Sequence, residues 1–422
     1  MSKKVKIGII GLGNRGRGLI EQNVLLMKDI EILALCDEYE DRVQQTKIMV
    51  EEANRPTPFC STDYKDVLNI EEIEAVLIFS AWESHVAIAI DAMKAGKYVG
   101  VEVGGAYSLE NCWELVRVSE ETNMPCMMLE NCCYGRTEMM ILNMVKKGIF
   151  GEVIHCEGGY HHDLRNEISN GIENRHYRFR NYLNRNCENY PTHELGPICN
   201  VLNINRGNRL VSLTSTASKA VGLHEYIVRE KGADSGLASA TFAQGDIVKT
   251  TIKCAGGQTI SLTLDTTLPG AYCRGFNVRG TKAQYNEVNN SIYIDGVHEK
   301  YEANWSEMWG NAVEFREEFD HPIWKEYIKG EIQLGHDGID WLVLRAFFES
   351  VKSGTQTPID VYDTVTLMCI SVLSEQSIQC GGGPVAIPDF TSGKWISRKP
   401  DAHGKYCLSE ICIDDSVSIF GS

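Results

Sequence analysis

The sequence has little positive charge, no long hydrophobic run, no internal repeat and no low-complexity segment. Its 422 residues include 41 Lys and Arg against 57 Asp and Glu, a formal net charge of −16. This balance argues against a nucleic-acid partner, because phosphates would be repelled. No apolar run approaches the roughly 20 residues of a membrane span, so we expect no membrane partner. Residues 1–4 lead at once into a strand, which leaves no room for a signal peptide and favours the cytoplasm.

Metal-binding cysteine pairs are also missing. The 15 cysteines are scattered without a C-x-x-C pair, and the adjacent Cys132 and Cys133 have a poor geometry for chelating one ion. His162 and Asp163 could form a zinc-type pair, but no suitably spaced third ligand accompanies them. In a reducing cytosol the cysteines are most simply free thiols, many of them buried. We therefore expect no metal.

A complete dinucleotide-binding unit is present at the start of the chain. A buried strand at Val5–Ile10 runs into residues 11–16 (GLGNRG), a G-x-G-x-x-G turn that opens a helix. Gly11 permits the tight turn, Gly13 lets the backbone approach a pyrophosphate, and Gly16 allows close helix–strand packing. The N–H groups at the helix start would bind the phosphates.

A second strand, Glu31–Cys36, ends at Asp37, 21 residues after Gly16. A carboxylate at this point would hydrogen-bond a ribose 2′-hydroxyl. The same carboxylate would repel a 2′-phosphate, so we expect NAD rather than NADP. A competing interpretation is an α/β turn that binds nothing, but the full order of strand, turn, helix, strand and acid disfavours it.

A chain of this length is too long for one ordinary core, which predicts two domains. Strands at 74–80, 97–102 and 125–130 alternate with helices up to residue 147, as in a parallel, doubly wound α/β sheet. We therefore place an NAD-binding Rossmann domain at residues 1–150.

From about Gly151 the pattern changes mainly to strands, which predicts an α+β domain over residues 151–422 with a mostly antiparallel open sheet. The expected strands are 153–158, 211–215, 247–254, 259–265 and 276–280, with a glycine-containing hairpin turn at 255–258. Late helices at 339–353 and 364–377 could pack back on the first domain. The free face of such a sheet could be buried against another copy, so we expect a homodimer or homotetramer.

A polar, aromatic-rich stretch at residues 157–197 is too dense in Tyr, His and Arg for a mere linker. Loops on a rigid scaffold often carry binding groups. A nicotinamide accepts hydride from a carbon that bears a hydroxyl, so a base must take the hydroxyl proton. The candidates by residue type are Lys97, His85, Glu102 and the Tyr and His residues of this stretch.

Residues 96–103 (GKYVGVEV), together with the fingerprint, resemble the glucose–fructose oxidoreductase/inositol dehydrogenase superfamily. In that family the strand usually ends in Glu-Lys-Pro, and the lysine assists hydroxyl deprotonation. This chain has Glu102, Val103 and Gly104 instead, and a valine cannot move protons. The resemblance therefore disfavours an ordinary dehydrogenase.

Three further motifs are similar to glycoside hydrolase family 109, the NAD-dependent α-N-acetylgalactosaminidase-like branch of that superfamily. They are residues 158–165 (GGYHHDLR), residues 189–197 (NYPTHELGP) and Tyr272 in LPGAY. This resemblance spans nearly the whole chain and implies NAD that is tightly bound and recycled. The sugar would be oxidised at C3 and deprotonated at C2, and the glycosidic oxygen would leave from C1. Water addition and re-reduction would follow, without the carboxylate pair of ordinary glycosidases.

The resemblance implies three sets of residues in this sequence. Its catalytic pair is Tyr160 and His193. The substrate set is Tyr160, Arg178, Tyr190, Pro191, Thr192 and His193. The cofactor set is Gly11, Gly13, Asn14, Arg15, Gly16, Asp37, Trp82, Glu83, Ser84, His85, Glu102, Val103, Asn131, Tyr190 and Tyr272. Imidazole titrates near neutrality, which suits His193 at C3, whereas a phenol of pKa ~10 needs a neighbouring cation to act at C2.

Simpler roles compete with several of these assignments. Pro191 would hold the chain extended, so Tyr190 and His193 could form a structural corner. His336 precedes a predicted helix and could border the pocket, but we leave it out of the catalytic set.

Structural roles are also open to the remaining polar and aromatic residues of the stretch. His161 and His176 could each satisfy a buried backbone carbonyl. Arg165 and Arg178 could form ion pairs with Asp163 or Glu173. The aromatic side chains that could simply pack in a core are Tyr177, Phe179 and Tyr182.

Three functions therefore remain open. The leading one is an NAD-dependent glycosidase that acts on a small glycoside, with an N-acetylgalactosaminide as one candidate. The second is an NAD-dependent sugar or cyclitol dehydrogenase, against which Val103 counts. The third is a non-catalytic NAD sensor, which would not need the crowded Tyr, His and Arg segment.

Overall fold

The computed structural model describes residues 4–298, 305–330, 336–399 and 404–411. Its first sheet has six strands in the order β3-β2-β1-β4-β5-β6, all paired in parallel. The strands are β1 (Val5–Ile10), β2 (Ile30–Cys36), β3 (Phe59–Ser61), β4 (Ala75–Ile78), β5 (Tyr98–Val101) and β6 (Cys126–Met128). The helices between and after them are α1 (Asn14–Gln22), α2 (Glu40–Glu52), α3 (Tyr64–Leu68), α4 (Trp82–Lys94), α5 (Leu109–Thr122) and α6 (Arg136–Lys146).

The second sheet has eight strands in the order β13-β12-β11-β7-β10-β9-β8-β14. They are β7 (Val153–His161), β8 (Leu210–Ala217), β9 (Ile247–Cys254), β10 (Thr259–Asp265), β11 (Asn277–Gly280), β12 (Ala283–Asn286), β13 (Ser291–Ile294) and β14 (Val385–Ala386). Neighbours are antiparallel except β7 and β10, which are parallel. The predicted fold class is confirmed, and so is the β9–β10 hairpin. The sequence patterns missed the short strands β12, β13 and β14.

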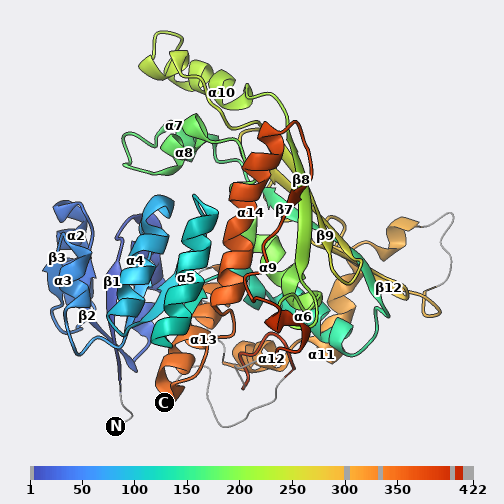
Figure 1. The fold of residues 1–422 in the computed structure, drawn as a ribbon, viewed down its shortest axis with the longest axis horizontal. Coiled ribbons are helices and arrows are strands. Elements are labelled where there is room, and N and C mark those ends of the chain that lie inside the picture. Colours follow the sequence, from blue (N-terminus) through green and yellow to red (C-terminus); the bar gives the residue numbers. More distant parts are fainter. Residues whose placement is uncertain (1–3, 299–304, 331–335, 400–403, 412–422) are drawn as a thin grey trace.

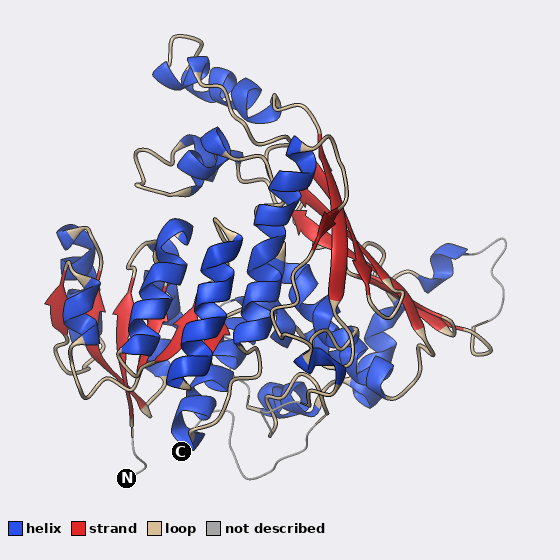
Figure 2. Ribbon diagram, in the orientation of Figure 1, coloured by secondary structure: helices blue, strands red, loops and turns tan. Residues whose placement is uncertain are grey.

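Helices cover one face of the second sheet (Figure 2). On that face β10 contributes Ile260, Leu262 and Leu264, which are buried, whereas β9 presents Lys249 and Lys253 to solvent on the other face. The free face is therefore polar, and burying it against another copy would require polar pairing.

The other helices are α7 (Arg165–Ser169), α8 (Arg178–Asn184), α9 (Thr192–Val201), α10 (Gly222–Lys231), α11 (Arg316–Phe319), α12 (Pro322–Lys329), α13 (Ile339–Ser353) and α14 (Val361–Gln379).

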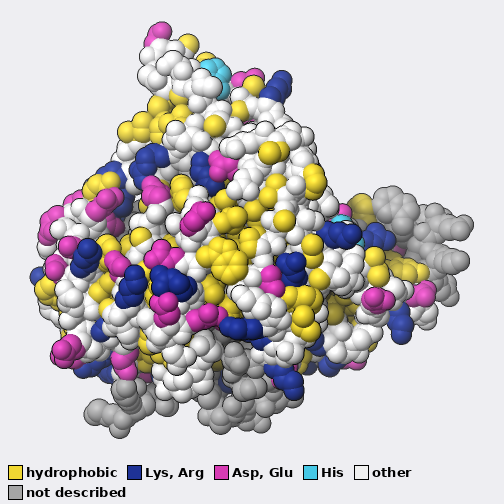
Figure 3. All heavy atoms as spheres, in the orientation of Figure 1, with side chains coloured by type: hydrophobic (Ala, Val, Ile, Leu, Met, Phe, Trp, Pro, Cys, Tyr) yellow, Lys and Arg dark blue, Asp and Glu magenta, His cyan; other side chains and the backbone are white. Residues whose placement is uncertain are grey.

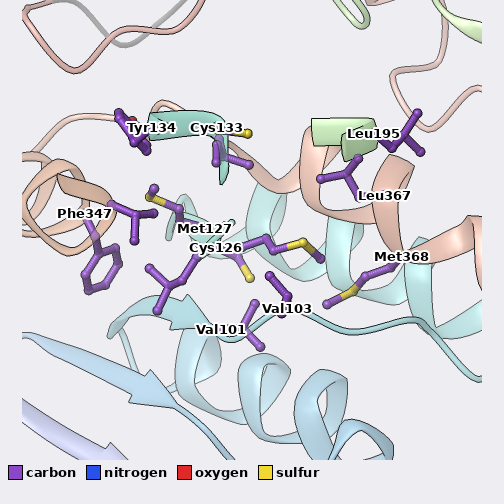
Figure 4. Packing of buried hydrophobic residues seen from close by; sticks show 14 of the residues in the cluster. Val101, Val103, Cys126, Met127, Cys133, Tyr134, Leu195, Phe347, Leu367 and Met368 are labelled. Atoms are coloured by element: carbon purple, nitrogen blue, oxygen red, sulfur yellow. The ribbon is translucent and has the colours of Figure 1, made fainter. Parts of the chain in front are cut away.

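The two sheets share one hydrophobic core, because late helices return to the first sheet. In Figure 1, α14 lies between the two sheets. Figure 4 shows Phe347 of α13 and Met368 of α14 packed near Val101 and Met127 of the first sheet. A Cβ added at Gly100 of β5 would lie 3.3 Å from the Phe347 ring, which shows how closely α13 packs there.

The polar stretch 157–197 is more regular than expected. It continues β7 to His161 and then forms α7, α8 and the start of α9. The expectation that Pro191 holds an extended chain is wrong, because Pro191 has φ −75° and ψ −16° and caps α9. Its fixed φ suits the entry to a helix as well as it suits an extended segment.

On the molecular face in Figure 3, basic and acidic side chains are interspersed rather than gathered into fields of one sign. The described part of the chain has no helix that is long and apolar enough to cross a membrane. Its cysteines are all free, and most are buried.

Candidate active site

The loop between β1 and α1 has the shape that a pyrophosphate needs. Gly11 has φ +99°, and a Cβ there would lie 2.3 Å from the Ser80 nitrogen. A Cβ at Gly16 would lie 2.3 Å from the Gly11 oxygen, so helix and loop touch through backbone alone. Gly13 caps α1 without a side-chain hydrogen bond, which leaves the first-turn N–H groups available. This cradle fits the phosphates of a dinucleotide.

Asp37 lies at the end of β2, beside this cradle. Its carboxylate accepts hydrogen bonds from the backbone N–H of Leu12 at 2.6 Å and of Tyr39 at 3.0 Å. Arg42 lies 3.8 Å from the same carboxylate. The acid is thus held rigidly where the fingerprint requires it, and it fits a ribose hydroxyl. Asn14, the exposed first residue of α1, accepts a hydrogen bond from Arg17 at 3.2 Å.

The segment that opens α4 has an aromatic contact and internal hydrogen bonds. Trp82 lies 4.8 Å from the Tyr177 ring, measured between centroids. Ser84 bonds to the Ser80 hydroxyl at 2.8 Å, and His85 Nε2 lies 2.9 Å from the Ser80 carbonyl. Burial lowers the pKa of His85 to about 4. His85 therefore stays neutral and supports the loop, which makes it a poor candidate for the hydroxyl base.

Lys97 is also unsuited to that role. It immediately precedes β5, at the opposite end of that strand from Glu102, and its Nζ donates to the Ile70 carbonyl at 2.8 Å. Val103 is 3% exposed and belongs to the hydrophobic cluster in Figure 4. The polar group that remains at this carboxyl end of β5 is Glu102.

A charged cluster joins the cofactor loop to the late part of the chain. Arg15 donates to both carboxylate oxygens of Asp340 at 2.8 Å, and its Nε lies 3.4 Å from Glu102. Asn131 donates to the same Asp340 at 2.7 Å. Burial raises the pKa of Glu102, and Arg15 opposes that effect. Three predicted cofactor residues thus meet around one acid that the sequence patterns did not reveal.

His336 lies at the edge of this cluster. Its Nδ1 is 2.6 Å from Asp340 and 3.3 Å from Arg15, and its side chain is 63% exposed. The hydrogen bond to Asp340 raises the pKa of His336. Burial alone would raise the pKa of Asp340, but His336 and Arg15 hold it well below its usual range.

Four aromatic side chains form the centre of the candidate substrate pocket. The Tyr160 ring stacks on Tyr190 with centroids 4.2 Å apart and meets His193 edge-on at 5.4 Å. Tyr272 lies 6.1 Å from Tyr160 and is 53% exposed. Tyr190 is also 5.8 Å from Trp82, which joins these rings to the segment that opens α4.

Tyr160 has a partner that the sequence patterns did not assign to it. Its hydroxyl lies 2.7 Å from Nδ1 of His162. Burial lowers the pKa of His162, with Arg178 acting in the same direction, so the ring stays neutral and can accept the phenol proton. Burial raises the pKa of Tyr160, which Arg178 partly offsets. Residues two apart at the end of a strand point the same way, and that period could have revealed the pair.

His193 pairs with a buried carboxylate. Its Nδ1 lies 2.8 Å from Glu130, which follows β6 and is 0% exposed. Burial alone would raise the pKa of Glu130, but His193 and hydrogen bonds keep it lowered. The pair resembles the orientation of a catalytic imidazole by an acid.

Cys132 completes a possible metal-binding group with these two residues. The candidate ligand atoms of Glu130, Cys132 and His193 lie within 4.8 Å of one another. However, burial raises the pKa of Cys132 well above its usual value. A neutral thiol is a poor ligand, and Glu130 already accepts hydrogen bonds from His193 and from the Cys132 N–H. The arrangement fits an imidazole–carboxylate pair better than a metal centre.

The remaining substrate candidates surround this centre. Arg178 is 8% exposed, lies 5.1 Å from the Tyr190 ring and pairs with Glu167 at 2.9 Å. Pro191 and Thr192 are buried at the start of α9, next in sequence to the partly exposed His193. The expected ion pair of Arg165 with Asp163 is present at 2.6 Å, whereas Arg178 pairs with Glu167 rather than with Glu173.

Structural roles were also open to three other residues, and the structure gives their contacts. Tyr182 is 1% exposed and bonds to Thr266 at 2.6 Å, as a packing residue would. His176 stacks on Tyr177 at 4.6 Å. His161 lies on the strand end that pairs with Cys273.

Comparison with known proteins decides the family. Residues 134–397 match the model of the glycosyl hydrolase 109 C-terminal domain, and residues 5–129 match the oxidoreductase family, NAD-binding Rossmann fold. The chain belongs to glycosyl hydrolase family 109. It is 39% identical to an α-N-acetylgalactosaminidase of Tannerella forsythia, covering 94% of this chain and 88% of the relative. It is 38% identical to a glycosyl hydrolase family 109 protein of Stenotrophomonas maltophilia, covering 94% and 91%.

Solved structures with a similar fold include dehydrogenases. A levoglucosan dehydrogenase in complex with NADH and L-sorbose superposes with a TM-score of 0.67 at 15% identity, covering 92% of this chain and 100% of that one. An inositol dehydrogenase homologue from Azotobacter vinelandii, complexed with NADH and myo-inositol, gives 0.64 at 16%, covering 92% and 98%. These matches show that family 109 shares its fold with sugar and cyclitol dehydrogenases. The resemblance stated from the motifs is confirmed.

Proposed function

We propose that this chain hydrolyses a small glycoside by transient oxidation at C3, using NAD that stays bound and is recycled in each turnover. The observation that carries this proposal is the paired arrangement of its two proton-transfer groups. The Tyr160 hydroxyl is hydrogen-bonded to His162 and the His193 ring to Glu130, and the rings of Tyr160 and His193 are 5.4 Å apart. Oxidation at C3 and deprotonation at C2 each need a base, and the two pairs would supply one for each step.

The cofactor would lie along the cradle and the edge of the first sheet. Its phosphates would bind at Gly13 and the start of α1, and its adenosine ribose at Asp37. When bound, NAD accepts a hydride and returns it, which is the chemistry that the chain's own side chains cannot supply. The remaining predicted contacts are Gly11, Asn14, Arg15, Gly16, Trp82, Glu83, Ser84, His85, Glu102, Val103, Asn131, Tyr190 and Tyr272.

His193 takes the proton of the C3 hydroxyl and returns it when C3 is reduced again. Glu130 orients the ring through Nδ1 and stabilises its protonated form. The other ring nitrogen, Nε2, remains to face the sugar. Since His193 is partly exposed while Glu130 is fully buried, the imidazole is the member of the pair that a ligand can reach.

Tyr160 removes the C2 proton, which a C3 ketone makes acidic. Its phenol proton passes to neutral His162, so that a phenolate forms only as the base is needed. Arg178 lies near both rings and stabilises the negative charge of the phenolate. The C1–O bond then breaks, the glycosidic oxygen departs with the proton that His162 had accepted, and a double bond forms between C1 and C2. Water adds across it, with the hydroxyl at C1 and the proton at C2.

Tyr190, Arg178, Pro191 and Thr192 would hold the sugar, with Tyr272 at the mouth. Because the related protein of Tannerella forsythia is called an α-N-acetylgalactosaminidase, an N-acetylgalactosaminide is our first candidate substrate. We further propose a cytoplasmic location and a homodimer or homotetramer. Free cysteines support a reducing compartment.

A sugar or cyclitol dehydrogenase is the second candidate, and the folds of the solved relatives favour it. Against it stands Val103, whose buried apolar side chain occupies the place of the assisting lysine. An aryl-glycoside panel with NAD⁺ in heavy water, followed by NMR, separates the two. We expect sugar release with deuterium at C2. Steady accumulation of NADH from free sugars, without release, would support the dehydrogenase instead.

A further inference from the structure

A segment of the second domain extends over the cofactor side of the first domain. The strap, residues 170–180, connects α7 to the first turn of α8. Figure 1 shows α7 and α8 projecting from the second sheet above the first sheet. Behind the strap, Lys231 of α10 donates to the Ser169 carbonyl at 2.6 Å and to Glu173 at 2.9 Å. Lys231 therefore anchors the strap to the second domain by hydrogen bonds.

The tip of the strap binds the helix that follows Asp37. Arg175 makes two parallel hydrogen bonds to Asp41 of α2, at 2.9 and 2.7 Å. Its guanidinium also lies 4.3 Å from the centre of the Tyr39 ring. Arg175 adopts φ +53°, a left-handed conformation that is unfavourable for a side chain of this size. Paired contacts with the other domain offset that local strain.

Arg42 connects the strap to the cofactor cradle. It donates to the Asn174 carbonyl at 3.1 Å and lies 3.8 Å from Asp37. The same guanidinium is 3.8 Å from the position of a Cβ on Gly13. One side chain thus bonds to the strap, pairs with Asp37 and lies beside the phosphate loop. The strap consequently lies over the adenosine end of the site.

A second set of contacts joins the later residues of the strap to the first domain. Arg180 pairs with Glu83 at the start of α4, and Tyr177 packs on Trp82. Both partners belong to the segment that we assign to the cofactor. The ion pairs Arg175–Asp41 and Arg180–Glu83 thus hold the strap closed, together with the hydrogen bond from Arg42.

We propose that the strap is a gate for the dinucleotide, which enters and leaves only when these two ion pairs separate. This inference rests on the proposed use of NAD but not on hydrolysis. A dehydrogenase that exchanges cofactor in every turnover must open such a gate each time. An enzyme that returns the hydride to its own substrate has no need to open it, and the closed strap keeps the cofactor in place between turnovers.

The test is the rate at which resting holoenzyme releases NAD, measured without any glycoside by dilution and assay of the freed dinucleotide. Exposed ion pairs are weak and screened by salt. We expect Arg175→Gln to speed release by about 2- to 5-fold, and Arg175→Gln with Arg180→Gln by about 10-fold. Raising the ionic strength should accelerate release from the native protein and have little further effect on the double variant.

Two controls separate gating from general weakening. Arg117→Gln breaks a matched exposed ion pair with Glu121, at 2.7 Å on α5, and should leave release unchanged. Arg175→Glu combined with Asp41→Lys restores opposite charges and should restore slow release, whereas Asp41→Lys alone should not. Release that is independent of salt and equal in the native protein and the double variant overturns the gate, even if the variants melt at lower temperature. Because no substrate is present, failure of the glycosidase proposal would leave this result intact.

Discussion

The two halves of the molecule assemble their sites in different ways. In the cofactor half, Gly11, Gly16 and Asp37 lie within one β-α-β unit, and short-range backbone geometry positions them. In the substrate half, Tyr160 comes from a strand end, His193 from α9 and Glu130 from the first domain. Glu130 lies 63 residues from His193 in sequence, and Asp340 lies 209 residues from Asn131.

This difference decides how each half responds to change. A cradle made of backbone depends on glycines, so an added methyl group disrupts it. A pocket made of side chains from distant elements depends on chemistry, so replacing one group can remove a function while the fold persists. The predictions that follow test this contrast.

The largest effect is expected from His193→Ala. Loss of a positioned acid–base group typically lowers kcat by roughly 10²–10⁴-fold, and we expect about 10³-fold with NAD binding retained. Tyr160→Phe should act similarly through C2 and abolish deuterium exchange. Tyr182→Phe is the matched control, because that buried phenol bonds to Thr266 outside the pocket. Unchanged turnover in the first two variants, with NAD and ligand bound, would refute the assignment.

Gly11→Ala should disrupt the cofactor half. The new Cβ would meet backbone at 2.3 Å at a residue with φ +99°, which predicts a loss of roughly 3–4 kcal/mol in unfolding free energy together with loss of NAD binding. Gly18→Ala is the control within α1, where a Cβ meets nothing within 4 Å. It should stabilise the protein by about 0.5–1 kcal/mol. Denaturant titration measures both, and equal behaviour of the two variants would contradict the geometry.

Glu188→Gln tests a buried acid two residues before Tyr190. Glu188 is 1% exposed, and burial raises its pKa from 4.5 to about 8. Between these values the folded state binds a proton that the unfolded state releases, so native stability falls as pH rises. The amide removes this dependence, and the variant should gain about 3 kcal/mol relative to the native protein between pH 4.5 and pH 7. Parallel stability curves over that range would show that Glu188 titrates normally.

His162→Gln should have the smallest of these effects, roughly a tenfold loss in kcat at the lower end of general acid–base contributions. The amide can still accept a hydrogen bond from Tyr160 but cannot take its proton. Because the pKa of His162 is lowered, native activity should lose this contribution only below the ordinary imidazole value, and the variant should lack that acid limb. His155→Gln, on the free face of the second sheet, should leave the pH–rate profile unchanged.

Much of the fold could be predicted from sequence because its signals are local. The run from Val5 to Asp37 specifies strand, turn, helix and acid in order, and β9 and β10 alternate visibly about a glycine turn. β12 and β13 were missed, although β11, which is equally short, was expected at 276–280. The helical start at Pro191 was missed because a fixed φ near −65° suits both helix and extended chain.

The site was harder to predict where partners are distant. Glu130 and Asp340 are ordinary acids in the sequence, and folding alone brings them to His193 and Arg15. His162 was visible as one of the candidate bases and as half of a zinc-type pair, but it was not paired with Tyr160, although its two-residue spacing indicated a shared face. The motif around His336 pointed to the pocket border, and the structure places it against Asp340.

The return of α13 to the first sheet has a consequence for synthesis on the ribosome. Arg345 of α13 is 1% exposed and bonds to Asp29, which precedes β2, at 2.9 Å. Chains grow from the amino end, so β1 and β2 emerge more than 300 residues before the helix that covers them. The nascent Rossmann half must therefore wait, with an apolar face uncovered and Asp29 unpaired, until almost the whole chain has been made. A fragment cut after the first domain would remain in that unfinished state.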